Sequence, residues 1–236
     1  MKIASIFLFI VAIFFFVSGY YAFDVFSKKT EIPQLRSATI QLAAVDSEGI
    51  GILIPLLIEM KPGTGKILMN IDNPSFIIDT QDSMRIAVKE AARITGYELN
   101  TIDILFSIKT EVSVVGGPSA GAAMTAATVS VLSDKPLNKS VAITGTIEEG
   151  GTIGQVGAVF EKAKAAKEAG ITLFLVPVGQ SVVEEPVENC TEKSGHGWKQ
   201  KQCTITTNIV NISKEIGIEV KEVATINDAL NYLLER

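Results

Sequence analysis

Two side chains of this 236-residue sequence have the type and setting needed for nucleophilic chemistry, and the first is Ser119. It lies in the run Gly117-Pro118-Ser119-Ala120, at the expected start of a helix over residues 118–132. Free backbone N–H groups and the positive end of the helix dipole meet at such a start, where they can stabilise an oxyanion. The alternative is an ordinary serine that caps the helix.

The second candidate is Lys162, in an expected helix over residues 157–169. Apolar residues at three- and four-residue steps place Lys162 in the middle of an apolar stripe. Burial there would lower the pKa of the lysine, so that its neutral amine could act as a general base. The alternative is a lysine whose stem packs on the stripe while its ammonium group reaches water. The stripe consists of Ala158, Val159, Ala165, Ala166 and Ala169.

Other chemistries fit the sequence less well. The single histidine, His196, lies between Cys190 and Cys203 in a polar segment that is poorly suited to orienting a base, which argues against a Ser-His-Asp triad. The same segment offers too few ligands for zinc, so no metal site is expected. No other cofactor is expected either. Residues 63–66, Gly-Thr-Gly-Lys, lack the first glycine and the final Ser/Thr of a phosphate-binding loop. The net charge of −5 argues against a nucleic-acid partner.

The N-terminus carries an uncharged stretch of membrane-spanning length. Residues 3–23 are apolar or aromatic almost throughout, and as a helix they would extend about 30 Å, the thickness of a bilayer core. We therefore predict a single-pass membrane anchor at 1–23 and a linker at 24–36. The alternative is a cleaved signal peptide, because small residues at 17–19 could admit a signal peptidase.

The sequence gives two opposing indications of membrane orientation. Three basic residues follow the apolar stretch and only Lys2 precedes it, which favours a cytoplasmic domain. Cys190 and Cys203, the only cysteines, flank a polar segment as a disulfide pair would, which favours an oxidising compartment. We expect a disulfide and an extracytoplasmic domain.

Residues 37–236 are predicted to form one domain of the α/β or α+β class, with a polar loop inserted at 181–206. The turn at 46–49 should join the first two strands in a hairpin, and Gly96 should end the first helix, which Asp79 or Thr80 should cap. Strands are expected at 37–45, 49–60, 66–71, 101–108, 140–147, 171–176 and 218–223, and helices at 79–95, 118–132, 157–169, 207–216 and 225–235.

Several motifs over residues 38–235 resemble, in order and spacing, the proteolytic domain of the Lon proteases. The resemblance implies an α+β fold of the Lon type, similar to ribosomal protein S5 domain 2. It also implies that Ser119 is the nucleophile, that Lys162 is the general base and that Thr144 orients the amine, with Gly117, Pro118 and Ala120 in the substrate and oxyanion region. The motifs are Gly117-Pro118-Ser119-Ala120-Gly121, Thr144-Gly145, Gly154-Gln155-Val156-Gly157 before Glu161-Lys162, and Ala169-Gly170-Ile171 before Val176-Pro177.

The resemblance further implies a membrane-bound serine endopeptidase that cleaves unfolded or flexible polypeptides without ATP, and a homo-oligomer, since Lon-like domains often form hexamers. This sequence departs from the family pattern at Gly116, where relatives often carry an acidic residue, and at Thr146, where bacterial Lon has glutamate. The cysteine-containing insertion is also foreign to the pattern. The alternative is a catalytically silent, peptide-binding scaffold. A third interpretation, a small-molecule kinase of related topology, is weaker because the sequence lacks a glycine-rich phosphate loop.

Overall fold

A computed structural model describes residues 35–70, 78–108, 117–195 and 198–235. The chain divides into two compact units, 1–33 and 34–236, and only the second lies within the described residues. The predicted anchor at 1–23 and most of the predicted linker at 24–36 are outside them. Within the described part of the chain, no helix combines the length and the apolar character needed to cross a bilayer.

The first two strands form the predicted hairpin. β1 (Arg36–Val45) and β2 (Gly51–Pro62) pair antiparallel, from Arg36 opposite Met60 to Val45 opposite Gly51. The carboxylate of Asp46 accepts hydrogen bonds from the backbone N–H groups of Glu48 and Ile50, both at 2.9 Å, and thereby closes the turn.

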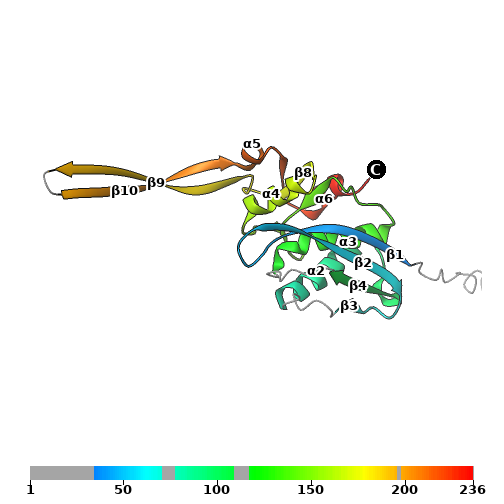
Figure 1. The fold of residues 1–236 in the computed structure, drawn as a ribbon. Helices are drawn as coiled ribbons and strands as arrows, with labels where there is room; N and C mark the ends of the chain where they lie inside the picture. Colours follow the sequence, from blue (N-terminus) through cyan, green and yellow to red (C-terminus); the bar gives the residue numbers. More distant parts are fainter. Residues whose placement is uncertain (1–34, 71–77, 109–116, 196–197, 236) are drawn as a thin grey trace, which may run out of the picture. The chain divides into compact units, whose positions relative to one another are not determined.

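These two strands form the centre of a seven-stranded mixed sheet in the order β11-β8-β5-β1-β2-β4-β3 (Figure 1). On the β2 side, β4 (Ile102–Ile108) pairs antiparallel with β2, and β3 (Ile67–Met69) pairs parallel with β4. On the β1 side, β5 (Val141–Ile143), β8 (Leu173–Pro177) and β11 (Glu219–Val223) continue the sheet through parallel pairs.

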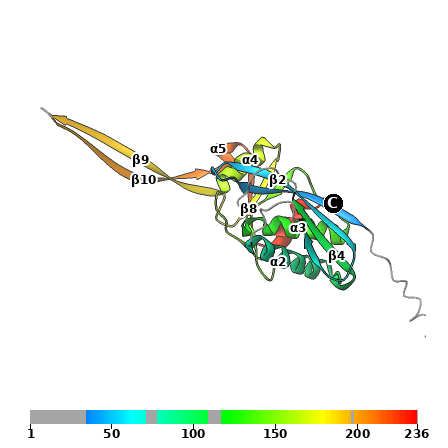
Figure 2. The same cartoon turned by 60° about the horizontal axis from the view of Figure 1, so that its bottom comes forward.

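Helices cover both faces of this sheet (Figure 2). α2 (Ile78–Thr95), α3 (Gly121–Ser133) and α6 (Ile226–Leu233) pack on one face, and α4 (Val159–Glu168) and α5 (Ile212–Ile216) on the other. The strand residues alternate accordingly: Leu42 faces the first group and Ala43 the second. Because the sheet separates the two layers, α3 and α4 can approach each other only beyond the ends of its strands.

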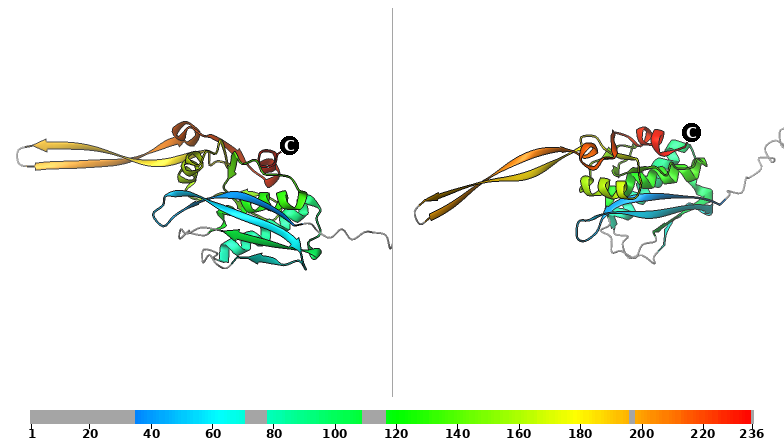
Figure 3. Two further views of the ribbon diagram at one scale, coloured as in Figure 1. Left: turned by 45° about the vertical axis from the view of Figure 1, so that its right-hand side comes forward. Right: turned by 45° about the horizontal axis from the view of Figure 1, so that its top comes forward.

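The region after β8 differs most from the prediction. In place of a loop at 181–206 and a helix from 207, the chain forms a long antiparallel hairpin of β9 (Val182–Gly195) and β10 (Trp198–Asn211), which projects from the sheet and its helices (Figure 3). Threonine, valine and isoleucine are frequent at 204–210, and their β-branched side chains favour a strand over the predicted helical turn. Of the helix predicted at 207–216, only residues 212–216 are helical, as α5.

The remaining elements follow the prediction with shifted ends. α2 begins by Ile78, so Asp79 and Thr80 lie inside the helix and do not cap it, and Gly96 ends it with a φ of 69°. Short 3-10 turns, η1 (Leu99–Thr101) and η2 (Pro118–Ala120), precede β4 and α3. The predicted strand at 140–147 is interrupted: β5 stops at Ile143, and β6 (Thr146–Ile147) turns away to pair with β7 (Ile153–Gly154).

Candidate active site

Ser119 lies in η2, directly before α3. Pro118 occupies the first position of the turn, where its missing N–H costs nothing, and the carbonyl of Ser119 accepts a 2.9 Å hydrogen bond from the N–H of Gly145. Gly121 allows this region to pack tightly, because a Cβ there would lie 2.7 Å from Cγ2 and 2.9 Å from the backbone N of Ile147. The start of α3 is therefore held firmly against β6.

Lys162 lies on α4 and is only 4% exposed. Val159, Ala165 and Ala166 are buried beside it, as the predicted stripe requires. The ends of the predicted stripe are wrong, because Ala158 and Ala169 are exposed and flank the helix. Ala163, which the stripe omitted, is fully buried, so α4 buries a broader face than the prediction gave it.

The amine of Lys162 meets two hydroxyl groups. Lys162 Nζ lies 3.1 Å from Ser119 Oγ and 3.5 Å from Thr144 Oγ1. Thr144 follows the last residue of β5, is fully buried, and donates through Oγ1 to the Ser119 carbonyl at 3.4 Å. Its oxygen is thus turned toward the amine as an acceptor, and the three side chains form one connected group beyond the end of β5.

Burial lowers the pKa of Lys162 from 10.5 to about 8, and the nearby carboxylate of Glu161 opposes this shift. With a pKa of about 8, roughly one amine in ten is neutral at pH 7, compared with about one in 10³ for an ordinary lysine. A neutral amine within hydrogen-bonding distance of a serine hydroxyl can accept its proton.

An open pocket of about 380 Å³ gives access to this group. Its wall is formed by the end of β1 at 44–45, the turn 117–119, Thr146 and the loop 155–158. Lys162 is the one ionisable side chain among the described residues that line it. A main-chain carbonyl could therefore reach Ser119 Oγ over a surface of small and apolar groups.

The turn around Ser119 also limits the choice of oxyanion donors. Pro118 has no N–H, the N–H of Gly121 bonds to the Pro118 carbonyl, and the N–H of Ala122 bonds to the Gly145 carbonyl at 3.1 Å. The N–H groups of Ser119 and Ala120 are the candidate donors from this turn. Gly117 is extended, and a Cβ there would meet no atom of the described residues within 4 Å.

Two features of the site were not anticipated from the sequence. The loop 155–158 is fastened by the side chain of Gln180, and Gly51 allows β2 to contact the α4 backbone at the carbonyl of Glu161. The turn signal Pro177-Val178-Gly179 was visible in the sequence, but nothing in it indicated what the following glutamine would contact.

The two cysteines are not part of this pocket. Cys190 and Cys203 face each other across β9 and β10 and form a disulfide. Glu188 lies close to both sulfur atoms, but sulfurs bonded to each other are not the thiolates that metal ions bind. This cluster therefore gives no support for a metal site.

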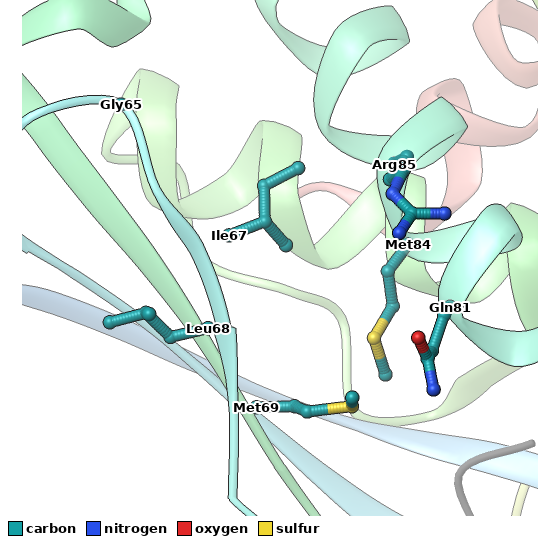
Figure 4. Close-up of a pocket in the computed structure, with 7 residues that line it drawn as sticks. All are labelled: Gly65, Ile67, Leu68, Met69, Gln81, Met84 and Arg85. Carbon is teal, nitrogen blue, oxygen red and sulfur yellow. The ribbon is translucent and has the colours of Figure 1, made fainter.

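A second pocket, of about 310 Å³, lies between the edge strand β3 and α2 (Figure 4). Ile67 and Met69 point toward Met84 on the helix, while Leu68 points the other way. Of the described residues that line it, Gln81 and Arg85 supply the polar groups, and none is a serine, cysteine or lysine.

Taken together, the fold and the site define a class: an α+β domain in which a serine at a helix start meets a buried lysine amine. Comparison with known proteins supports one family. Residues 85–195 match the model for the Lon protease (S16) C-terminal proteolytic domain, which supports a Lon-type proteolytic domain in this chain. Ser119, Thr144 and Lys162 all fall within the matched range.

Relatives in this comparison include archaeal Lon proteases, of which this chain covers only a part. The archaeal Lon protease of Archaeoglobus fulgidus is 26% identical over 199 residues, which cover 81% of this chain and 27% of the relative. The archaeal Lon protease of Thermoplasma acidophilum is 30% identical over 132 residues, covering 56% of this chain and 20% of the relative. The chain thus spans about a quarter of the length of the curated relatives it matches.

Proposed function

We propose that this protein is a serine endopeptidase in which Ser119 is the nucleophile and Lys162 the general base. The observation that carries the proposal is the 3.1 Å distance between Lys162 Nζ and Ser119 Oγ, at an amine whose pKa is lowered by burial. The match of residues 85–195 to a family of proteolytic domains supports the same chemistry.

In the proposed reaction, neutral Lys162 takes the Ser119 hydroxyl proton as Oγ attacks the peptide carbonyl. The N–H groups of Ser119 and Ala120 stabilise the resulting oxyanion. The Lys162 ammonium then gives its proton to the departing amine, which leaves an ester on Ser119. Lys162 next takes a proton from water, the hydroxide attacks the ester, and the proton returns to Ser119 as the acid is released.

We further propose that cleavage needs no ATP and acts on unfolded or flexible chains. Residues 63–66 form the one glycine-lysine run that resembles a phosphate loop, but backbone N–H groups of this run already have a hydrogen-bond acceptor within the protein. The N–H groups of Thr64 and Lys66 donate to the Asp103 carboxylate at 2.8 and 2.9 Å, so an acidic side chain takes the place that a phosphate would need. A substrate that is cleaved without ATP must present an extended segment unaided.

Location and assembly are part of the proposal. The apolar length of residues 3–23 supports a membrane anchor, and the Cys190–Cys203 disulfide supports an extracytoplasmic domain. A homo-oligomer, hexameric by resemblance to other Lon-like domains, is the proposed assembly.

The test uses the full chain in detergent micelles with unfolded casein and with a tightly folded protein of similar size, each with and without Mg-ATP. We expect cleavage of casein only, at equal rates with and without ATP, and no cleavage by Ser119→Ala. Casein bound by the wild type but left intact would instead support the catalytically silent, peptide-binding alternative. Cleavage that requires ATP would overturn the proposed independence.

A further inference from the structure

The loop between β7 and α4, residues 155–158, forms one wall of the pocket and leads directly into the helix that carries Lys162. Its last residue, Ala158, has φ 55° and ψ 41°. Among the described residues, Ala158 and Asp134 are the non-glycine residues with positive φ. A left-handed alanine is unfavourable by itself, so its surroundings must hold it there.

Ala158 also begins the hydrogen bonding of the helix. Its carbonyl accepts from the backbone N–H of Lys162 at 3.1 Å. The conformation of the loop therefore sets where α4 starts and how Lys162 is aimed. A loop that relaxed would change the direction of the amine and admit water beside it.

The side chain of Gln180 supplies the restraint. Its Oε1 accepts from the backbone N–H of Val156 at 2.9 Å, and its Nε2 donates to the Val156 carbonyl at 2.7 Å. One carboxamide thus pairs with both backbone groups of a single loop residue, as a neighbouring strand would. The side chain of Gln155 adds a longer bond of 3.5 Å, from Nε2 to the Val178 carbonyl.

Gln180 is itself fixed by its neighbours. Its backbone N–H donates to the Pro177 carbonyl at 3.1 Å, which closes a turn through left-handed Gly179 at the end of β8. The next residue, Ser181, donates to the Glu222 carboxylate at 3.0 Å and accepts from the N–H of Ile212 at 3.1 Å. The carboxamide is therefore attached to the core sheet and to the base of the β9–β10 hairpin.

We propose that Gln180 is a positioning residue for the reaction: by pairing with Val156 it holds the 155–158 loop in the shape that aims Lys162 at Ser119 and keeps water away from the amine. This inference rests on the proposed peptidase function. Gln180 need not touch the substrate, and it acts through the loop and the helix start. Only a side chain with both a donor and an acceptor at this reach can make both bonds.

The decisive variant is Gln180→Met, which keeps the length and packing of the side chain and removes both hydrogen bonds. Gln180→Asn, which keeps the carboxamide one methylene short, serves as a milder second variant if the first unfolds. Gln202→Met, at an exposed position on β10, is the matched control. Thermal unfolding of the full chain in micelles checks the fold of each.

Two readouts separate positioning from general stability. For casein cleavage we expect kcat to fall about tenfold or more with KM changed less than threefold, since the amine is misaligned while the substrate surface remains. By NMR of the full chain with lysine ¹³C-labelled at Cε, with the Lys162 signal assigned from Lys162→Met, we expect the pKa of Lys162 to rise toward its ordinary value by about one unit as water reaches the amine. Gln202→Met should change neither.

The outcomes are distinguishable. A wild-type protein that does not cleave casein, combined with a raised Lys162 pKa in Gln180→Met, would defeat the peptidase proposal while still supporting the claim that Gln180 holds the loop and shields Lys162 from water. An active wild type, with kcat and the Lys162 titration both unchanged in Gln180→Met, would overturn the positioning role alone.

Discussion

Lys162 Nζ lies 3.1 Å from Ser119 Oγ although the two residues are 43 positions apart in the sequence. Their helices lie on opposite faces of the sheet, with α3 among α2 and α6 and α4 beside α5. The two side chains meet because β5 stops at Ile143, so that beyond its end no strand separates the layers. Thr144, the first residue past that end, donates to the Ser119 backbone carbonyl and accepts from Lys162 Nζ.

Removing either member of this pair should abolish cleavage. Ser119→Ala and Lys162→Arg are expected to lower kcat at least about 10³-fold, because alanine has no nucleophile and a guanidinium does not release its proton to become a base. Casein cleavage and circular dichroism are the measurements. Near wild-type activity in either folded variant would contradict the assignment.

The pH dependence should follow the neutral amine of Lys162. Activity should rise with pH through about 8 and then level off, because burial lowers the pKa of the lysine to about 8 and only the deprotonated form accepts the Ser119 proton. Glu161, whose carboxylate opposes the shift, is the control: Glu161→Gln should move the rising limb to lower pH. A limb at the ordinary lysine pKa would contradict a buried base.

The same pKa shift makes Lys162 a stability cost. The pKa of Lys162 is about 8 in the folded protein and 10.5 in the unfolded chain, so the unfolded chain binds more protons between about pH 8 and 10.5. The loss in free energy of unfolding is therefore complete below pH 8 and disappears as the pH rises through that window. Lys162→Met should therefore be inactive yet more stable at pH 7, by about 1–3 kcal/mol. Urea unfolding at pH 7 and pH 10.5 measures this, and a gain as large at pH 10.5 would argue against the ionisation as its cause.

Thr144→Val tests the orientation of the amine. The swap keeps the shape and removes the hydroxyl that accepts from Lys162 Nζ, so we expect the plateau rate to fall about tenfold. Because that oxygen stabilises the ammonium form, the rising limb should also move to lower pH. Thr128→Val is the control, since its buried hydroxyl bonds within α3 to the Met124 carbonyl. A full pH–rate profile identical to the wild type would remove Thr144 from the site.

Gly51→Ala tests how closely β2 must approach α4. A Cβ at Gly51 would overlap the carbonyl of Glu161 and lie 3.2 Å from Cβ of Ala165, so the helix that carries Lys162 must shift. We expect a loss of about 1–3 kcal/mol in the free energy of unfolding and a reduced kcat. In Gly157→Ala the new Cβ meets no atom of the described residues within 4 Å, so the stability of this variant should match the wild type. Equal stabilities for both variants would show that the contact is not restrictive.

The Cys190–Cys203 disulfide should stabilise the hairpin and not the catalytic core. Reduction, or a Cys190→Ser/Cys203→Ser variant, should cost about 2–4 kcal/mol locally, seen as faster amide hydrogen exchange in β9 and β10 with casein cleavage retained. In protein isolated with thiols blocked, we expect both cysteines oxidised. Free labelling of both would contradict an extracytoplasmic domain.

The sequence alone was sufficient for elements whose signals are local. The β1–β2 hairpin was predictable from two apolar runs around the turn at 46–49, and α2 from its helical spacing and Gly96. The sequence also singled out Ser119 and Lys162, because both signals are local. One is a serine that follows glycine and proline at a helix start, and the other is a lysine on an apolar stripe.

Tertiary structure decided everything that depends on contacts between distant segments. The apolar stripe around Lys162 did not give the true limits of α4. The polar composition of 181–206 favoured a loop, whereas the structure has a hairpin whose two strands are stabilised by pairing with each other. The fit of Gly51 against Glu161 and the pairing of Gln180 with Val156 join residues 110 and 24 positions apart, and no local pattern encodes them. Burial, which lowers the pKa of Lys162, is likewise a property of the whole fold: the sequence places the amine on an apolar face, and only packing removes it from water.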